Sequence, residues 1–572
     1  MRLTLREPSA TVEPLPVMTT DSAAPDTAAR AALDIRSLPS TSRLARDYAF
    51  DSGRVASFFA GDPADAAAWR DTIARVTAHD AHTATARRAL TAVLRGQQAR
   101  RGAPEAARTA AARLDLPGSV AVVTGQQAGL FGGPLYTLLK AASALVLAVH
   151  AEATYGVPVV PVFWVDAEDH DWAEVSACPV LGEDDTVVSV TATGPSGAGT
   201  RSVGSLLLDG SIAGTLDALE QALPPTAFTA GLMADLRRAY RPGTGFARAY
   251  ATWLETVLGP RGLVVFESDD PGAKPPVADL FAAELTSAPR TSQLAAEAGQ
   301  ALEALGYHAQ VQPAADATAL FTVGESRVAI KVSGTQCQAG ASAPVERDAF
   351  AARIRQAPAT VGPNVLLRPL VQDTLFPTVC YVAGPGELAY LAQLKTVYAA
   401  YDLPMPLVHT RASGTFLDSN AARFLSRNNL TFDMLQAQDE RALNALLAAQ
   451  MPAEVDEASQ AAAQAITASL DALATAVMAI DGTLEGAVRS ASGRMQDDLK
   501  KLQGKILQAA KKKDETLRRQ FRHARVQAFP EGTPQERLIG FVAFLNRVGP
   551  GLVDRILAEM PPTAGQHWLV TL

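Results

Sequence analysis

An apolar strand, a glycine-rich loop and a long apolar helix follow one another in this sequence, and no other feature constrains the fold as strongly. Residues 119–123 (SVAVV) are a β-branched run, and residues 124–133 (TGQQAGLFGG) supply the loop. Pro134 then favours helix initiation, and a helix is expected over 135–150. A second apolar run covers 157–165. This order is typical of a βαβ unit, so the sequence predicts an α/β fold with a parallel sheet.

The rest of the chain divides by composition into a tail, a core and a helical end. Pro, Thr, Ser and Ala dominate the first residues without apolar periodicity, which is typical of a flexible tail. Polar and glycine-rich stretches interrupt the apolar runs of the core and indicate insertions. The expected parts are the flexible tail 1–34, a core 35–453 with inserted segments at about 181–235 and 290–360, a helical hairpin 454–529, and a C-terminal segment 530–572 that packs back on the core.

Apolar residues spaced alternately four and three apart mark the helical hairpin. The first seam consists of Ile466, Leu470, Leu473, Val477, Ile480 and Leu484. This a/d pattern predicts a coiled coil, and Asp481-Gly482 interrupts it before a second helix over 483–528. Two long helices joined by a short break make an antiparallel pair. Because an isolated pair leaves an apolar seam uncovered, we expect it to join two copies of the chain in a homodimer.

The charge of the hairpin differs from that of the whole chain. The formal net charge of the 572 residues is −8, yet residues 494–525 contain eleven Lys/Arg and four Asp/Glu. This basic stripe is either the solvated face of the coiled coil or a surface for nucleotide phosphates or an acidic partner. No aromatic stacking platform accompanies it, so we expect no nucleic-acid partner.

Cysteine usage and hydropathy indicate the compartment. Cys178, Cys337 and Cys380 are far apart and lack CxxC spacing, which argues against a disulfide framework or a thiolate zinc site. The longest apolar stretches are about half the length of a membrane helix, and no basic segment precedes an apolar run at the N-terminus. We therefore expect a cytoplasmic protein with no membrane partner.

The glycine loop is the first candidate ligand site, through Gly125, Gln126, Gln127 and Gly133. It follows a strand of the predicted parallel sheet, where α/β proteins bind ligands, and glycines let the backbone approach a phosphate or carboxylate. The loop matches neither GxGxxG nor a Walker A motif, so a tight packing turn is the alternative. Adjacent amides favour a ligand site because they are poor core residues. Lys140 is placed to reach a phosphate unless it is solvated.

The second candidate is the acidic segment that follows the strand 157–165. Four acids and a histidine occupy residues 166–171 at the carboxyl edge of the predicted sheet. Such groups suit Mg²⁺ or a general base, whereas the alternative is a helix N-cap with acids that favour the dipole. A cap needs one acid and not four. The catalytic candidates are therefore Glu168, Asp169, His170 and Asp171, with the metal left undecided.

Two further polar clusters follow at 364–373 and 384–390. The second of them again combines a strand, a glycine turn and a helix, and a plain turn is the alternative. The candidate binding residues are Asn364, Arg368, Gln372, Asp373, Gly384, Gly386, Glu387 and Tyr390, with Arg411 further on.

Five segments occur in a specific order: TGQQAGLFGGPLYTLLKA, VPVFWVDAEDHDW, NVLLRPLVQD, YVAGPGELAYLAQLK and FPEGTPQER. Together they resemble the BshC family, the cysteine-adding enzymes of bacillithiol biosynthesis. The resemblance runs from about Leu38 to the end of the chain. It implies a Rossmann-like core with connecting insertions and a C-terminal coiled coil. The departures are the N-terminal tail and Gly132, where the family more often has a polar residue.

The resemblance implies a ligase that attaches the carboxyl group of cysteine to the glucosamine amine of glucosaminyl-malate. Because an amine does not displace oxide from a carboxylate, ATP is the expected activator, with Mg²⁺ on its phosphates. Residues 125–133 and 384–387 are then expected to hold substrate or nucleotide, and the acidic segment to supply a base. Arg368 or Arg411 would pair with the malate carboxylates. The alternatives are a nucleotidyltransferase-like enzyme on the same fold and a non-catalytic dimer scaffold, against which the acidic segment argues.

Overall fold

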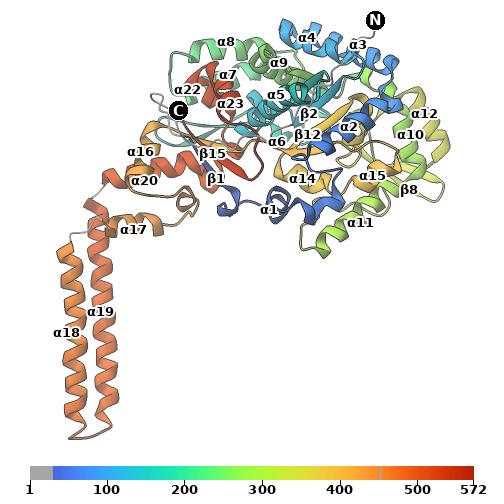
Figure 1. Ribbon diagram of the computed structural model, residues 1–572. Helices are drawn as coiled ribbons and strands as arrows, with labels where there is room; N and C mark the ends of the chain where they lie inside the picture. Colours follow the sequence, from blue (N-terminus) through green and yellow to red (C-terminus); the bar gives the residue numbers. More distant parts are fainter. Residues whose placement is uncertain (1–29, 450–452, 514) are drawn as a thin grey trace, which may run out of the picture.

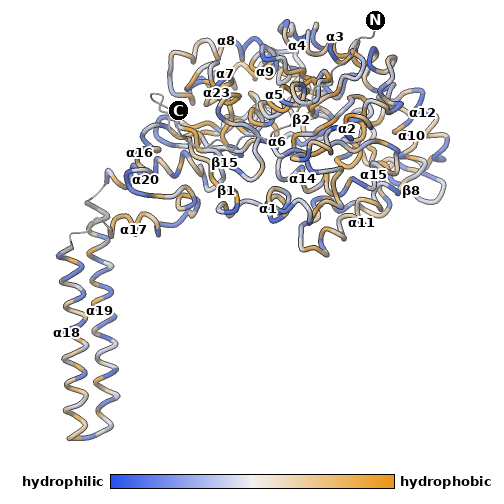
Figure 2. Tube along the Cα trace, viewed as in Figure 1, coloured by the Kyte–Doolittle hydropathy of each residue, from blue (hydrophilic) through white to orange (hydrophobic). Residues whose placement is uncertain are grey.

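The computed structural model describes residues 30–449, 453–513 and 515–572. A rounded α/β body holds most of the chain, and two long helices project from it as a stalk (Figure 1). Apolar segments gather inside the body, whereas apolar and polar residues alternate along the stalk (Figure 2). Most of the predicted tail, residues 1–29, lies outside the described residues.

The core of the body is a five-stranded parallel sheet with the strand order β13-β12-β2-β3-β6. Its strands are β2 (Val120–Gln127), β3 (Val159–Asp166), β6 (Val264–Glu267), β12 (Thr378–Ala383) and β13 (Leu407–Thr410). This confirms the predicted parallel-sheet core. The sequence analysis placed residues 124–127 in a loop, but they continue β2 and pair in register with β3 as far as Gln127 and Asp166.

Helices cover both faces of this sheet, which is why its strands are apolar on both sides. Val162 and Trp164 of β3 pack into one core cluster with α10 (Ala278–Ser287) and α13 (Arg368–Leu375). Phe163 and Val165 of β3 pack into another cluster with α5 (Leu135–Tyr155) and α9 (Phe246–Leu258). Helices α1 (Arg43–Phe50), α2 (Ala66–Ala78), α3 (Ala84–Arg101), α4 (Glu105–Ala112), α14 (Pro385–Leu391), α15 (Lys395–Ala400), α21 (Gln535–Leu538), α22 (Phe541–Val548) and α23 (Gly551–Glu559) complete the layers.

Helix α5 (Leu135–Tyr155) connects β2 to β3 and is longer than expected. Among the described residues it is the helix long and apolar enough to cross a membrane by length and composition. However, 72% of its apolar window is buried inside the molecule, as expected of a central core helix.

Two insertions extend the sheet connections near the predicted positions. The first contains the antiparallel pair β4 (Ala177–Leu181) and β5 (Val187–Thr191) after α6 (Trp172–Val175), and then α7 (Ser211–Ala222) and α8 (Thr229–Ala239). The second contains α11 (Arg290–Ala304), α12 (Arg347–Gln356) and an antiparallel sheet of β7 (Ala317–Thr322), β8 (Val328–Ser333), β9 (Gln336–Ala339), β10 (Val345–Glu346) and β11 (Val361–Pro363).

A small three-stranded sheet joins the two ends of the described chain. It consists of β1 (Arg30–Asp34), β15 (Gln566–Thr571) and β14 (Gly414–Leu417). Residues 30–34, predicted as part of the flexible tail, therefore form a strand that pairs antiparallel with the C-terminal strand. The local sequence of residues 30–34 did not predict this strand, because the strand depends on a partner more than 500 residues away.

The stalk consists of α18 (Ala453–Val477) and α19 (Leu484–Lys513), which pair along their length as predicted. The predicted second helix does not stay in the stalk beyond α19. Residues 515–528 form α20, which packs with α16 (Ser419–Arg427) at the base near α17 (Arg441–Ala449), and Phe521 contacts Phe424 there. Four apolar side chains of α20 are buried in this contact, and their burial favours the bend away from the stalk.

Candidate functional site

A cavity of about 470 Å³ opens at the carboxyl ends of β2, β3 and β12. The chain runs from β2 outward through β3 to β6, and then returns to the other side of β2 through β12 and β13. The helix that follows β2 and the helices that follow β12 therefore lie on opposite faces of the sheet. Open α/β sheets bind ligands at such a switch point. The lining residues are Gly125, Gln126, Gln127, Trp164, Asp166, Glu168, Asp169, Phe321, Arg327, Pro363, Asn364, Val365, Arg368, Tyr381, Glu387 and Tyr390.

Lys140 forms an ion pair with Glu387, which lines this cavity. The Lys140 Nζ donates to Glu387 Oε2 at 2.6 Å, to the carbonyl oxygen of Gly125 and to Gln126 Oε1 at 3.2 Å. Glu387 also accepts from the backbone N–H of Gly384 and from the Tyr381 hydroxyl, both at 2.7 Å. Burial lowers the pKa of Lys140, and Glu387 opposes that shift. The pair therefore locks the two predicted glycine segments together, and Lys140 does not lie free for a phosphate.

Gln127 and Asp169 join the glutamine pair to the acidic segment. Gln127 Nε2 donates to Asp169 Oδ2 at 2.5 Å, and Asp169 Oδ1 accepts from the backbone N–H of His170 at 2.7 Å. Burial alone would raise the pKa of Asp169, but these donors and the Arg327 guanidinium at 3.7 Å hold it below its usual value. The segments expected to converge around one cavity therefore do so.

The other predicted catalytic residues have structural partners. Glu168 lines the cavity, but its Oε1 is paired with the buried Lys274 Nζ at 2.5 Å. Asp171 is the N-cap of α6 and accepts from the backbone N–H of Glu174, as the alternative interpretation expected. The His170 ring is 45% exposed and contacts Asp169. Within the described ranges, no group of three His, Cys, Asp or Glu side chains is placed to hold a metal ion.

Arg368 provides a buried positive charge at the cavity. It begins α13 and donates to Tyr390 Oη at 3.0 Å and to Gln372 Oε1 at 3.2 Å. Among the described residues it forms no ion pair with a carboxylate. In the turn before α13, Asn364 Oδ1 accepts from the backbone N–H groups of Leu366 and Leu367. A buried guanidinium with neutral partners suits an anionic ligand.

Gln372 and Asp373, also predicted to bind ligand, lie behind Arg368 rather than on the cavity. Asp373 accepts from the Tyr398 hydroxyl at 2.5 Å and from Gln372 at 2.9 Å, and burial raises its pKa to about 6. These contacts support the position of α13. Gly133 is also distant from the cavity: its carbonyl oxygen accepts from the backbone N–H of Phe541 at 3.1 Å, so it forms a packing turn.

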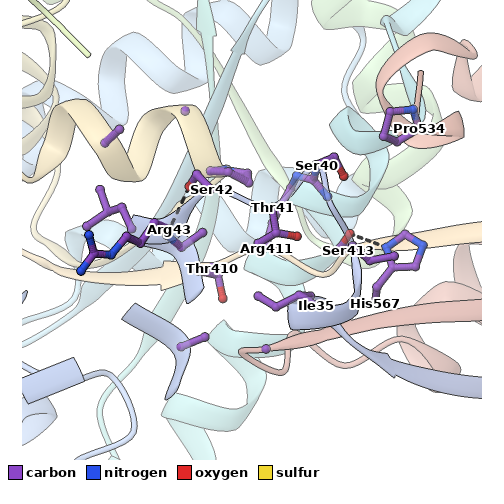
Figure 3. Close-up of a pocket in the computed structure, with 18 of the residues that line it drawn as sticks. Ile35, Ser40, Thr41, Ser42, Arg43, Thr410, Arg411, Ser413, Pro534 and His567 are labelled. Carbon is purple, nitrogen blue, oxygen red and sulfur yellow. Dashed lines mark hydrogen bonds between the residues drawn. The ribbon is translucent and has the colours of Figure 1, made fainter. Parts of the chain in front are cut away.

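Arg411 lies in a second cavity of about 450 Å³ (Figure 3), which Pro385, Gly386 and Ala389 of α14 also line. Its guanidinium is bidentate with Glu536, at 3.0 and 2.7 Å. In Figure 3 it lies near Ser413 and His567, between residues 40–43 of the N-terminal segment and the C-terminal strand. Gly386 lines this second cavity as well, so neither residue faces the first one.

Several residues that line the first cavity were not among the predicted site residues, and Arg327, Trp164 and Asp166 are three of them. Arg327 comes from the turn between β7 and β8, where its guanidinium carbon lies 3.8 Å from the centre of the Phe321 ring. Its insertion carries no motif that would have marked it. The buried indole N–H of Trp164 has no hydrogen-bond partner in the described parts of the chain. Asp166 is the last residue of β3, and only its position at the strand end was a signal.

Comparison with known proteins identifies the family. A family model described as "Bacillithiol biosynthesis BshC, N-terminal Rossmann-like domain" matches residues 32–412, and a second, for the BshC C-terminal coiled-coil domain, matches residues 414–572. The chain belongs to the BshC family. The two family models meet just before β14, which pairs with the C-terminal strand β15.

Relatives in this family are similar over nearly their whole length. A Salinibacter ruber protein named "Putative cysteine ligase BshC" is 35% identical over 533 residues, which are 92% of this chain and 95% of the relative. Proteins of the same name from Heliobacterium modesticaldum and Geobacillus kaustophilus are 32% and 30% identical, and the matches cover 92% and 93% of this chain and 98% of each relative. The predicted BshC family membership is therefore confirmed.

Proposed function

We propose that this chain is a cysteine ligase of bacillithiol biosynthesis that joins the carboxyl group of L-cysteine to the glucosamine amine of glucosaminyl-malate. The observation that carries the proposal is the cavity at the switch point, where Arg368 and Arg327 face the acidic end of β3. Two guanidinium groups suit the two carboxylates of a malate, and a nearby acid suits an amine. The name of the BshC relatives, "Putative cysteine ligase BshC", supports a ligase that uses cysteine.

Of the two arginines expected to pair with malate, Arg368 is the better candidate. Arg411 already has a carboxylate partner in Glu536, so binding malate there would leave Glu536 buried without its cation. Arg368 has only neutral hydrogen-bond partners among the described residues, and Arg327 shares its charge with Asp169 at 3.7 Å. We assign one malate carboxylate to Arg368 and the other to Arg327.

Activation of the cysteine carboxylate by ATP is part of the proposal. ATP would convert the carboxylate into an acyl adenylate or acyl phosphate, because a free carboxylate does not react with an amine. The amides of Gln126 and Asn364 offer donors for carboxylate or phosphate oxygens. The described residues offer no cluster of three metal-ligating side chains. Any Mg²⁺ would therefore be held mainly by the phosphates of the nucleotide.

A pyrophosphate or phosphate exchange assay tests this function. ATP–pyrophosphate or ATP–phosphate exchange should require cysteine, and mass spectrometry should find the cysteinyl amide once glucosaminyl-malate is added. Exchange that is independent of cysteine would favour the nucleotidyltransferase alternative. A chain that neither exchanges nor forms the amide, while remaining folded, would favour the scaffold.

Two further expectations belong to this proposal. The stalk joins two copies of the chain, because several of its large apolar side chains are exposed after α18 and α19 have paired. The reaction takes place in the cytoplasm. The three cysteines are free and buried, which suits a reducing compartment.

A further inference from the structure

Asp166 occupies a distinct place among the acids of the switch-point cavity. It ends β3 directly opposite Gln127 in the sheet register, so its position is fixed by the central sheet rather than by a loop. Its side chain lines the cavity. No described residue donates a hydrogen bond to its carboxylate. Asp166 therefore has its oxygen lone pairs available for a ligand.

The other acids of the cavity are occupied. Glu168 is paired with Lys274, and Glu387 is paired with Lys140 and accepts from two further donors. Asp169 accepts from Gln127 and from the backbone of His170. Each of these carboxylates would have to give up a partner before accepting a proton from substrate. Asp166 would not.

We propose that Asp166 is the catalytic general base that removes a proton from the substrate amine. This inference rests on the proposed ligase function and adds a catalytic residue to it. With malate carboxylates on Arg368 and Arg327, the remaining acid that faces the same cavity is the one without protein partners. A base must lie within hydrogen-bond reach of the proton that it takes, and the cavity wall provides that position.

The substrate ammonium gives one proton to an Asp166 oxygen and becomes a neutral amine. Its nitrogen forms a bond to the acyl carbon of the activated cysteine. The bond from that carbon to the phosphate or adenylate oxygen breaks, and the electron pair leaves with the oxygen. The nitrogen loses a second proton to solvent as the amide forms.

The surroundings of Asp166 shift its pKa in the direction that strengthens a carboxylate as a base. Burial raises its pKa above the usual aspartate value, which makes its carboxylate more basic. The charged and titratable groups that face it are Arg368 and Arg327, which stabilise the carboxylate, and Glu168, Asp169, Glu174 and Tyr390. The negative charges of Glu168 and Asp169 disfavour the charged form of Asp166, so they act in the same direction as its burial.

The test compares two acceptors for the activated cysteine. Glucosaminyl-malate needs a base, whereas hydroxylamine is already neutral at pH 7. Asp166→Asn should slow amide formation with glucosaminyl-malate about 100- to 1,000-fold, and cysteinyl hydroxamate formation should stay within about threefold of the parent. The acid limb of the pH profile for amide formation should then follow the titration of the substrate ammonium alone. Asp279→Asn, the same change at an exposed surface aspartate, is the matched control.

Each result has a defined meaning. Equal loss of both products by a variant with unchanged thermal unfolding would overturn the base role, as would full amide formation by Asp166→Asn. If Asp166→Asn does not fold, Asp166→Glu must keep an acid limb with a reduced rate, and its absence would contradict the inference. Failure of the parent protein to form the hydroxamate with ATP would instead overturn the proposed ligase function, and the inference with it.

Discussion

At the scale of single residues, partners rather than residue type decide which side chains are available for chemistry. Arg368 and Arg411 are both buried arginines near glycine turns, yet Arg411 has Glu536 and Arg368 has only neutral partners. Burying a guanidinium without an anionic partner is unfavourable, because its charge has lost its hydration and is not compensated. The same reasoning separates Asp166 from its paired neighbours. The residue predictions below use that difference.

Arg368→Lys should weaken binding of glucosaminyl-malate. Lysine loses the bidentate geometry and the contacts to Tyr390 and Gln372, so KM should rise roughly 10- to 100-fold, as expected for about 1.5–3 kcal/mol in a charged hydrogen bond. Steady-state kinetics measure this change, with Arg355→Lys on the surface of α12 as the control. The KM for cysteine should be nearly unchanged. Turnover of glucosamine without malate should be insensitive to the variant, and an equal loss there would contradict the malate assignment.

Gly132→Ser should destabilise the fold by about 2–4 kcal/mol, because it combines left-handed backbone strain with overpacking. Gly132 has φ +104°, and a Cβ atom would lie 2.2 Å from Cε1 of Phe541. The space that a side chain would need at this position is thus filled by the aromatic ring of Phe541. Urea unfolding measures the change. Gly231→Ser, where a Cβ meets nothing within 4 Å, should be nearly neutral, and equal stability of the two variants would refute this account.

At the scale of secondary-structure elements, α20 connects the stalk to the α/β body. His523 on α20 donates from Nδ1 to Asp185 at 2.6 Å and from Nε2 to Asp418 at 2.9 Å. Asp185 lies in the turn between β4 and β5, and Asp418 is the N-cap of α16. Hydrogen bonds to these two carboxylates raise the pKa of His523 from 6.5 to about 9. One charged side chain thus joins three elements.

This contact makes stability depend on pH. Because the folded pKa of His523 is raised, its contribution is complete below about pH 6.5, declines as pH rises to about 9, and is absent above that. Since the ring is partly exposed, we expect roughly 1–2 kcal/mol at pH 6. The difference in urea unfolding between the parent and His523→Gln should therefore be present at pH 6 and vanish at pH 9.5. A difference that persists at pH 9.5, or that His150→Gln reproduces, would contradict this.

At the scale of the whole molecule, the stalk keeps apolar side chains exposed after its two helices have paired with each other. Leu473, Met495 and Leu502 remain 48–52% exposed on the two long helices, and Ile480 at the tip is 82% exposed. Apolar side chains repeated along a projecting stalk are typical of an interface. The switch-point cavity lies in the body, so we expect association through the stalk and the proposed chemistry to be separable.

The triple variant Leu473→Glu, Met495→Glu, Leu502→Glu should be a monomer, whereas we expect the parent protein to be a dimer. Three buried charges per chain are incompatible with an apolar interface, whereas one chain can keep them in water. Light scattering at micromolar concentration measures the mass, and amide formation per chain should stay within about twofold. Gln464, Gln503 and Gln508 changed to Glu provide the same charge at exposed positions, and that variant should stay dimeric. A parent protein that is already monomeric would disprove the dimer.

The sequence by itself determined the parallel sheet, the long coiled coil and the edge of the sheet at which polar groups gather. These features depend on local apolar periodicity and on glycine turns, and both can be read within about 45 residues. That the glutamine pair lies close to the acidic segment also followed, because neighbouring parallel strands end at the same edge, whereas the hydrogen bond from Gln127 to Asp169 is known only from the structure. Residues 30–34 and the bend at α20 did not follow, since their partners are distant in sequence.

Only the tertiary structure decided which side chains are free. Arg411 is neutralised by Glu536, 125 residues away, and Glu168 by Lys274, 106 residues away. Arg327 reaches the cavity from an insertion without a motif. The physical reason is that the charge balance of a buried group depends on what packs against it, and spacing along the chain does not encode that.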